Sequence, residues 1–376
     1  MSSNNWRVLA QRLLTKEWLS WDVPLRDAGV TRTLSGPGAI SGNITPELAQ
    51  LKADDGRPLI EQWSTALYVE VDGRIRNGAI VTNVETSGAS RAITSAGFSG
   101  YPTGIPYMDD YMPTTFEDPL TVFRNIWSYV QSFPDGNLGL VVDPSPSTWM
   151  RLGSGDGPYR ISWFENKDCG QELENIAQSV PFDYLEHHSW NGSRTDVNHF
   201  LEVGFPRLGA RRDDLMFQGG MNVTAVSTVT HDGERFANDV YLLGPGEGRA
   251  MLRARASQPD GRLRRCAVIP YKHATQGFLD RRAPQELASR RGLIDIPSFT
   301  VEDHPSAPMA AIMPGDDVLL SVDLEWEGQI DVWLRVLEID ESQARVGEAT
   351  LKTMRSEFFN YVPAESPTGQ IQPISM

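Results

Sequence analysis

Short hydrophobic segments with alternating polar positions dominate the first hundred residues. Three apolar residues alternate in the segment ALYVEVDGRIRNGAIVTNV: Leu67, Val69 and Val71. This period of two is typical of a strand that buries one face. Asp72-Gly73 predicts a hairpin turn directly after this strand, and Asn77-Gly78 predicts a second turn. The spacing therefore predicts a β-meander in a strand-rich region from Trp6 to about Tyr107.

The middle of the chain has the 3.6-residue period of helices instead. Asp118 suits the N-cap of a first helix, and Pro119 suits its first position. The apolar residues of one face are Leu120, Phe123, Ile126, Trp127 and Val130. A second helix is expected from about Asp168 to Gln178, where Asp168 and Gln171 have capping-box spacing. This section is therefore predicted to be α+β.

The last part of the chain returns to strands. The strand candidates are the segments PFDYLEHHSW, NHFLEVGF, NVTAVSTVTHDGERFANDVYLLG, AMLRARAS, LRRCAVIPY, SFTVED, DDVLLSVDLEW, IDVWLRVLEID and ARVGEATLKTM. His231-Asp232-Gly233 and Met313-Pro314-Gly315-Asp316 predict turns between them. One helix is expected among them, from about Pro284 to Arg290.

These patterns predict a mainly β protein, α+β overall, with two barrel-like or sandwich domains. We expect a first strand-rich domain at 1–106, an α+β connecting domain at 107–220, and a second strand-rich domain at 221–357. Residues 256–300 are a candidate second piece of the connecting domain. Residues 358–376 contain Pro, Ser, Gly and Gln with little periodicity, which predicts an exposed tail.

Charge excludes some functions for these 376 residues. The chain has 49 acidic and 34 basic residues and a formal charge of -15. Such a field opposes the phosphate contacts that drive tight nucleic-acid binding. No apolar stretch reaches the roughly 18 residues of a membrane span, and the start has no signal-peptide pattern. We therefore expect synthesis in the cytoplasm without stable membrane insertion, and buried thiols at Cys169 and Cys266.

No catalytic, cofactor-binding or metal-binding motif is found in the sequence. His187 and His188 are expected on opposite faces of one strand, so they cannot hold one metal together. The chain lacks the phosphate-binding loop, the dinucleotide fingerprint and the nucleophile elbow. Three acidic pairs leave glycoside hydrolysis open as an alternative: Asp109-Asp110, Asp213-Asp214 and Glu325/Glu327. No cofactor is predicted.

Several tryptophans raise the possibility of a binding surface. Trp127 and Trp333 lie in apolar patterns and are expected in the core. Trp6, Trp18 and Trp21 near the N-terminus are candidates for an aromatic cluster that anchors a partner.

The most distinctive segment is FPRLGARRDDLMFQGGMN. Arg207, Arg211 and Arg212 are followed at once by Asp213 and Asp214. Arginine forks next to carboxylates favour an ion-pair network, so we expect a structural junction between the connecting domain and the second strand-rich domain. A phosphate site is the alternative for this segment.

Taken in order, several stretches resemble minor tail proteins of actinobacterial siphophages, of the baseplate-hub or tail-associated type. They are TALYVEVDGRIRNGAIVTNVE, GYPTGIPY, DPLTVFRNIWSYVQSFPDGNLGLVVD, PFDYLEHHSW, FPRLGARRDDLMFQGGMNV, FANDVYLLGPGEG and PGDDVLLSV. They cover most of the chain, and none is a catalytic signature.

The resemblance implies a structural, non-enzymatic protein of the virion tail tip. It implies two barrels related to the tail-tube fold, joined by an α+β domain, with three chains in a ring of pseudo-sixfold symmetry. Such a hub would close and extend the tail tube and form part of the DNA exit channel. The implied partners are two further copies of this chain, the distal tail protein or tail tube, the tape measure protein, other minor tail proteins and DNA in transit. A cell-wall glycan-binding or glycan-hydrolysing tail protein is the alternative.

Overall fold

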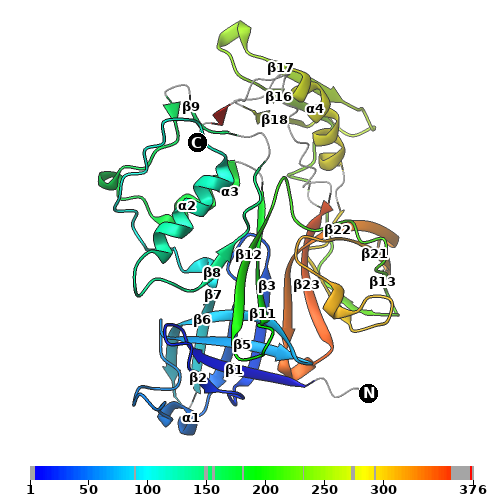
Figure 1. Cartoon of the computed structure of the whole chain (residues 1–376). Helices are drawn as coiled ribbons and strands as arrows, with labels where there is room; N and C mark the ends of the chain where they lie inside the picture. The colour runs from blue at the N-terminus through cyan, green and yellow to red at the C-terminus, as the bar shows by residue number, and fades with distance from the viewer. Residues whose placement is uncertain are drawn as a thin grey trace.

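The computed structural model describes residues 5–88, 90–147, 151–154, 157–179, 182–231, 233–271, 276–291, 294–356 and 373–374. Strands predominate, so the predicted mainly β fold is confirmed. Figure 1 shows the N-terminal strands at the bottom, the C-terminal strands at the right, and two helices above the N-terminal strands. The expected tail at 358–376 lies outside the described residues except for 373–374, and Asp232 of the expected turn also lies outside them.

One sheet of 13 strands runs through both strand-rich regions. Its N-terminal half consists of β1 (Trp6–Arg12), β2 (Trp18–Ser20), β3 (Arg26–Thr33), β4 (Ala39–Ile44), β5 (Thr65–Val71), β6 (Arg74–Ser87) and β7 (Ser90–Gly97). Its C-terminal half consists of β13 (Phe217–Gln218), β14 (Val223–Val226), β20 (Ser298–Glu302), β21 (Asp317–Leu324), β22 (Gly328–Ser342) and β23 (Glu348–Arg355).

The two halves are joined by the pairing of β22 with β3. The 15 residues of β22 span about 50 Å at a strand's usual rise. The first part of β22 pairs with β21, and its end pairs antiparallel with β3, from Glu338 opposite Thr33 to Ser342 opposite Gly29. Because one strand belongs to both halves, backbone hydrogen bonds continue across their boundary.

Strand β5 is buried on both faces. Leu67, Val69 and Val71 contact the core inside the N-terminal half, as their alternation predicts. Ala66 and Tyr68 contact a second core, which contains the middle section. The single charged residue, Glu70, is buried beside Arg7 and accepts a hydrogen bond from the Trp190 indole at 3.0 Å. A strand between two cores loses the polar face that an exposed sheet would show.

The predicted hairpin turn is confirmed at Asp72-Gly73, where both residues have positive φ, 51° and 77°. The turn predicted at Asn77-Gly78 is wrong, because both residues lie inside β6. Gly78 is opposite Tyr68, and a Cβ atom there would lie 2.8 Å from the Tyr68 ring. This glycine therefore makes room for a buried ring and does not reverse the chain.

The middle section packs two helices and a small sheet on the second face of β5. Helices α2 (Pro119–Gln131) and α3 (Cys169–Ser179) confirm the two predicted helices. The small sheet has the order β11 (Asp183–Trp190), β12 (Val197–Gly204) and β8 (Leu140–Val142). All five predicted residues of the α2 apolar face are buried. Asp118 is the N-cap residue of α2 as predicted, but its side chain accepts from the Ser147 backbone N–H at 3.1 Å and not from the helix.

A separate core lies under α4 (Gln276–Arg291). This helix packs on a sheet of β17 (Arg253–Ser257), β16 (Asp239–Leu243) and β18 (Cys266–Pro270). The predicted start at Pro284 is wrong, because the helix already includes Gln276. Its buried residues Leu279, Ala283 and Leu287 have helical spacing across the proline. Burial of this face therefore offsets the roughly 3 kcal/mol that proline costs inside a helix.

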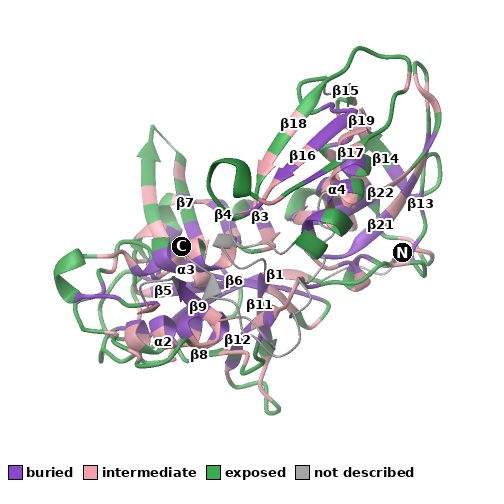
Figure 2. Ribbon diagram, turned by 90° about the horizontal axis from the view of Figure 1, so that it is seen from above, coloured by how far each residue is buried: buried purple, intermediate pink, exposed green. Residues whose placement is uncertain are grey.

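The burial pattern follows these cores. Figure 2 shows buried residues along the strands of both halves and along α2, and exposed residues in the outer loops. The remaining elements are α1 (Pro46–Gln50), β9 (Arg151–Ser154), β10 (Gly157–Pro158), β15 (Thr230–His231), β19 (Ile294–Asp295), β24 (Pro373–Ile374) and the 3-10 turns Phe98–Gly100, Trp163–Glu165, Gly248–Ala250, Met309–Ala311 and Gln343–Arg345. The domain boundaries expected from the sequence stay a prediction.

Candidate functional site

The arginine-rich segment lies between β12 and β13, along the start of β21. Asp317 donates its backbone N–H to the Ala210 carbonyl at 2.9 Å, and Arg212 donates its backbone N–H to the Asp317 carbonyl at 2.8 Å. The segment thus adds a short parallel connection to the C-terminal half immediately after it leaves the middle section.

Two of the three predicted arginines bind carboxylates that lie far from them in the sequence. Arg207 lies 2.6 Å from Asp317, and Arg212 lies 2.9 Å from Asp316. Both carboxylates are only 6% exposed. Arg212 also binds exposed Asp214 through two hydrogen bonds of 2.7 and 2.8 Å. Hydrogen bonds from Arg212 to Asp214 and Asp316 raise the pKa of Arg212, so this guanidinium stays charged.

A fully buried ion pair extends this network to the middle section. Arg335 of β22 is fully buried, and its Nη2 lies 2.5 Å from Oδ2 of Asp183 on β11. Leu208 completes the pair, because its N–H donates to Asp183 at 2.9 Å and its carbonyl accepts from Arg335 at 3.0 Å. The same guanidinium lies 3.9 Å from Asp317. The pairs therefore form one chain of alternating charge from β11 to β21.

The backbone at Gly209 packs directly against the backbone at Gly315. Gly209 has φ +78°, and a Cβ atom on it would lie 2.1 Å from the carbonyl oxygen of Gly315. Gly315 also has positive φ, +102°. Only glycine fits such an approach without movement of the backbone. The segment and the turn before β21 are in direct backbone contact.

The third predicted arginine plays a different role. Arg211 and Asp213 form a pair at 3.1 Å, but both side chains are exposed, 60% and 72%. The Arg211 guanidinium stacks 3.7 Å above the Trp333 ring. The expectation that Trp333 lies in the core is therefore wrong, because the ring is half-buried and covered by Arg211. Exposed pairs and exposed cation–π contacts each contribute about 1 kcal/mol or less.

The sequence pointed to the segment but missed its strongest partners. Asp316 and Asp317 are the two acids of PGDDVLLSV, and Arg335 is the single charge in the apolar run VWLRVL. A lone charge within an apolar strand signals a buried pair. The partner of that charge, Asp183, is 152 residues away and has no local signal. The role of the five predicted residues as a structural junction stays a prediction.

The histidines on β11 point in opposite directions, as expected. His187 lies 2.6 Å from Glu202 near the surface, whereas His188 is buried. His188 Nδ1 lies 2.9 Å from Nδ1 of His199 on β12. Burial, followed by the charges of His188 and Lys16, lowers the pKa of His199 to about 2, so it is neutral at physiological pH. Within the described ranges no three His, Cys, Asp or Glu side chains could hold a metal ion together.

Other candidates from the sequence lie apart from this network. Trp18 and Trp21 stack at 4.6 Å and contact Trp190, with Trp21 47% exposed. Cys169 is buried as expected, but Cys266 is exposed on β18, which corrects that expectation. The acids Asp109, Asp110 and Glu325 are exposed, like Asp213 and Asp214, and Glu327 is half-buried. No helix in the described part of the chain is long and apolar enough to cross a membrane.

The fold is similar to those of several tail proteins among solved structures. A 43 kDa tail protein of prophage MuSo2 from Shewanella oneidensis matches with a TM-score of 0.57 and 16% identity, over 94% of this chain and 99% of that chain. A tail protein from Neisseria meningitidis MC58 matches with a TM-score of 0.56 and 15% identity, over 94% of this chain and 98% of that chain. A prophage tail protein from Listeria monocytogenes EGD-e matches with a TM-score of 0.55 and 12% identity, over 93% of this chain and 95% of that chain.

This chain shares the fold of these tail proteins. The structural similarity shows a shared fold. At 12–16% sequence identity it does not establish a shared function. No protein-family model and no curated protein matches the sequence. The fold itself includes both halves of the 13-stranded sheet and the middle section, because the matches extend over nearly the whole chain.

Proposed function

We propose that this chain is a structural protein of the phage tail tip, a non-enzymatic baseplate hub. The observation that carries the proposal is the near full-length match to three tail proteins, two of them from prophages, over at least 93% of this chain and 95% of each other chain. A match confined to one barrel would indicate only a common module. A match of whole chains indicates a common arrangement of modules.

The proposed assembly is a homotrimer at the tail tip of an actinobacterial siphophage. Each chain contributes two strand-rich halves joined through β3 and β22, so three chains place six such halves around one axis. A ring of this kind fits a sixfold tail tube, which it would close and extend. The proposed neighbours are the distal tail protein or tail tube, the tape measure protein and other minor tail proteins, and the ring would form part of the DNA exit channel.

The buried ion pairs support a mechanical role in this proposal. Arg335 with Asp183 links the C-terminal half to the middle section, and Arg207 and Arg212 bind the start of β21. Hydrogen-bonded arginine–carboxylate pairs are directional, whereas apolar contacts are not. A hub that transmits force between tube and tip needs such a fixed relation between its parts.

Localisation on intact particles tests the proposal. Antibody-gold labelling of purified phage should mark the tail end far from the capsid, and the chain should be detected by mass spectrometry in the same particles. Isolated protein incubated with host cell wall should release no reducing sugar. Labelling elsewhere on the particle, absence from it, or wall hydrolysis by the pure chain would contradict the proposal.

A further inference from the structure

A cavity rich in arginine lies where three parts of the chain meet. Its walls come from β3 and β6 of the N-terminal half, from β11 of the middle section, and from the loop before β21. The cavity measures about 150 Å³. Three arginines line it: Arg32, Arg74 and Arg76. Three of the 34 basic residues of this acidic chain therefore line one cavity.

The two buried arginines of the cavity share one carboxylate. Arg32 donates to Glu341 at 3.0 Å, while the Nε of Arg76 lies 3.9 Å from the same side chain. The side chains of Arg32 and Arg76 are 10% and 14% exposed, and Glu341 is 5% exposed. The second contact of Arg32 is the Met313 sulfur at 3.6 Å, a weak acceptor. The two arginines therefore share the Glu341 carboxylate, while the second buried acid of the cavity, Glu186, is bound elsewhere.

One donor of each of these two arginines has no protein acceptor. The Nε atoms of Arg32 and Arg76 are buried without a hydrogen-bond partner among the described residues. Burial lowers the pKa of Arg32, Glu341 opposes this, and the neighbouring charge of Arg76 lowers the pKa further. Two like charges held together at low exposure cost free energy unless an anion compensates them.

The other acids near the cavity already have partners. Glu186 accepts hydrogen bonds from the N–H groups of Phe98 and Ser99, at 2.9 and 2.8 Å, and lies 3.3 Å from His188. Glu348, which lines a neighbouring pocket together with Arg76, is paired with Arg345 at 2.9 Å. His187 at the cavity wall is directed to Glu202. These contacts leave Glu341 as the main counter-charge for Arg32 and Arg76.

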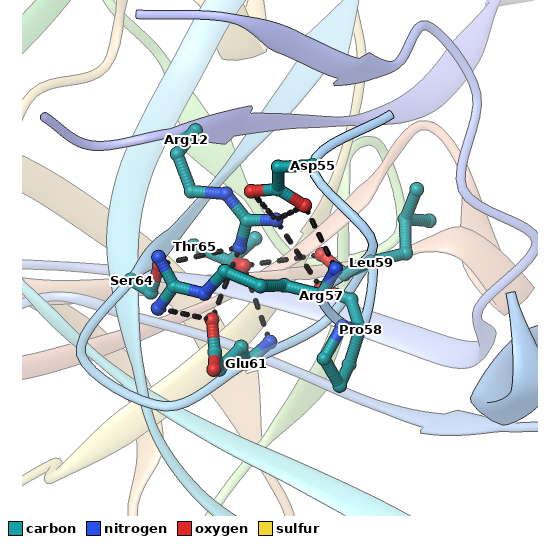
Figure 3. Close-up of polar contacts among 8 residues, drawn as sticks. All are labelled: Arg12, Asp55, Arg57, Pro58, Leu59, Glu61, Ser64 and Thr65. Carbon is teal, nitrogen blue, oxygen red and sulfur yellow. Dashed lines mark hydrogen bonds and ion pairs between the residues drawn. The ribbon is translucent and has the colours of Figure 1, made fainter. Parts of the chain in front are cut away.

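Arg12 shows how this chain compensates a buried arginine elsewhere. Its guanidinium contacts two carboxylates, Asp55 at 3.0 Å and Glu61 at 3.3 Å (Figure 3). Ser64 accepts a further hydrogen bond from it at 3.2 Å. Arg57 also pairs with Glu61 at 2.6 Å, so this site has as many acids as arginines, whereas Arg32 and Arg76 share the single carboxylate of Glu341.

We propose that this cavity binds a small tetrahedral oxyanion of the phosphate class, with Arg32 and Arg76 as its ligands and exposed Arg74 at the entrance. Donors that come from two strands, β3 and β6, suit an anion with oxygens in several directions better than a planar carboxylate. A phosphate supplies the negative charge that Glu341 and Glu186 leave uncompensated among the three arginines. The bound anion lies where the three parts of the chain meet, and its arginine ligands all come from the N-terminal half.

Thermal unfolding of the full chain tests this site with inorganic phosphate as the probe. Sodium phosphate should raise the unfolding temperature saturably above sodium chloride of matched ionic strength, because a ligand that binds only the folded state stabilises it. Arg76→Gln should weaken phosphate binding at least about tenfold, since a hydrogen bond to a charged group contributes about 1.5–3 kcal/mol. Arg253→Gln removes an equal charge from exposed β17 and should keep wild-type binding.

If Arg76→Gln does not fold, a direct measurement of phosphate binding to wild type and to Arg74→Gln still tests the site. Equilibrium dialysis with labelled phosphate should give a stoichiometry of one per chain, and Arg74→Gln at the exposed entrance should weaken it. Glycerol phosphate distinguishes the sources: equal affinity indicates a phosphate group on a larger molecule, and binding of inorganic phosphate alone indicates the free ion. Equal effects of phosphate and chloride, or wild-type affinity in both Arg74→Gln and Arg76→Gln, would overturn the proposal.

Discussion

Arg335 and Asp183 form a buried ion pair that connects the C-terminal half of the sheet to the middle section. Their side chains approach to 2.5 Å, although they lie 152 residues apart in sequence. Both strands that carry them are otherwise apolar at this point, with Leu334, Val336 and Tyr184 buried beside the pair. The pair thus helps to fix the position of the middle section relative to the C-terminal half.

Arg335→Met should destabilise the protein by about 3–5 kcal/mol, because it leaves the Asp183 carboxylate buried without its charge partner. Urea unfolding at neutral pH measures the change. The double variant Arg335→Met with Asp183→Leu should recover much of the loss, since no charge is then left buried. Arg211→Ala is the control, and its exposed pair should contribute about 1 kcal/mol or less. A loss below about 1 kcal/mol for Arg335→Met would contradict the assignment.

Gly209→Ala should be far more harmful than Gly220→Ala. Both glycines have φ near +78°, so alanine costs about 1–2 kcal/mol at either position from the backbone alone. At Gly209 the new Cβ atom also collides with Gly315, whereas nothing lies within 4 Å of a Cβ at Gly220. The difference between the two variants in thermal unfolding isolates the backbone contact. Equal losses would show that the contact is not needed for folding.

Stability should fall in mild acid because of His199. Burial lowers the pKa of His199 to about 2, while an unfolded histidine has a pKa of about 6.5. Below about pH 6.5 the unfolded chain therefore binds a proton that the folded chain does not. The contribution of His199 is complete above this pH and is lost as the pH falls toward 2, by up to about 1.4 kcal/mol per pH unit.

Unfolding of wild type and His199→Gln, compared from about pH 6.5 to about pH 5, measures this contribution. The variant should show the shallower dependence on pH. His187→Gln is the matched control, because His187 lies near the surface beside Glu202. Identical slopes in wild type and His199→Gln would exclude His199 as the source of acid sensitivity.

Negligible DNA affinity is expected despite the proposed DNA channel. A net charge of -15 on each chain repels phosphate, so DNA in transit meets a surface to which it does not adhere. Electrophoretic mobility shift at low salt should detect no complex. Retention on a DNA column that is released by rising salt would contradict this expectation.

Local patterns predicted the elements well, because they depend on near neighbours. The apolar face of α2, the alternation of Leu67, Val69 and Val71, and the Asp72-Gly73 turn are all found in the structure. Errors arose where distant contacts decide the conformation. Gly78 faces Tyr68 and so stays in a strand, and α4 continues through Pro284 because Leu279 is buried.

The candidate site was predictable only in part, for the same reason. The sequence places Arg207 and Arg212 near acids, but the buried acids they bind are 104 to 110 residues further along the chain. Asp183 and Arg335 have no sequence neighbours that indicate each other. The arginine cavity is likewise formed by residues from three parts of the chain, and its charge imbalance appears only in the folded structure.

The number of copies in the tail tip tests the central proposal most directly. A reconstruction of the tail end of intact phage particles, computed without imposed symmetry, shows how many chains of this fold surround the axis. The account predicts three copies in one ring, with two strand-rich halves of each chain arranged in pseudo-sixfold symmetry against the tail tube. Two, four or six copies, or density for this chain away from the tip, would contradict it.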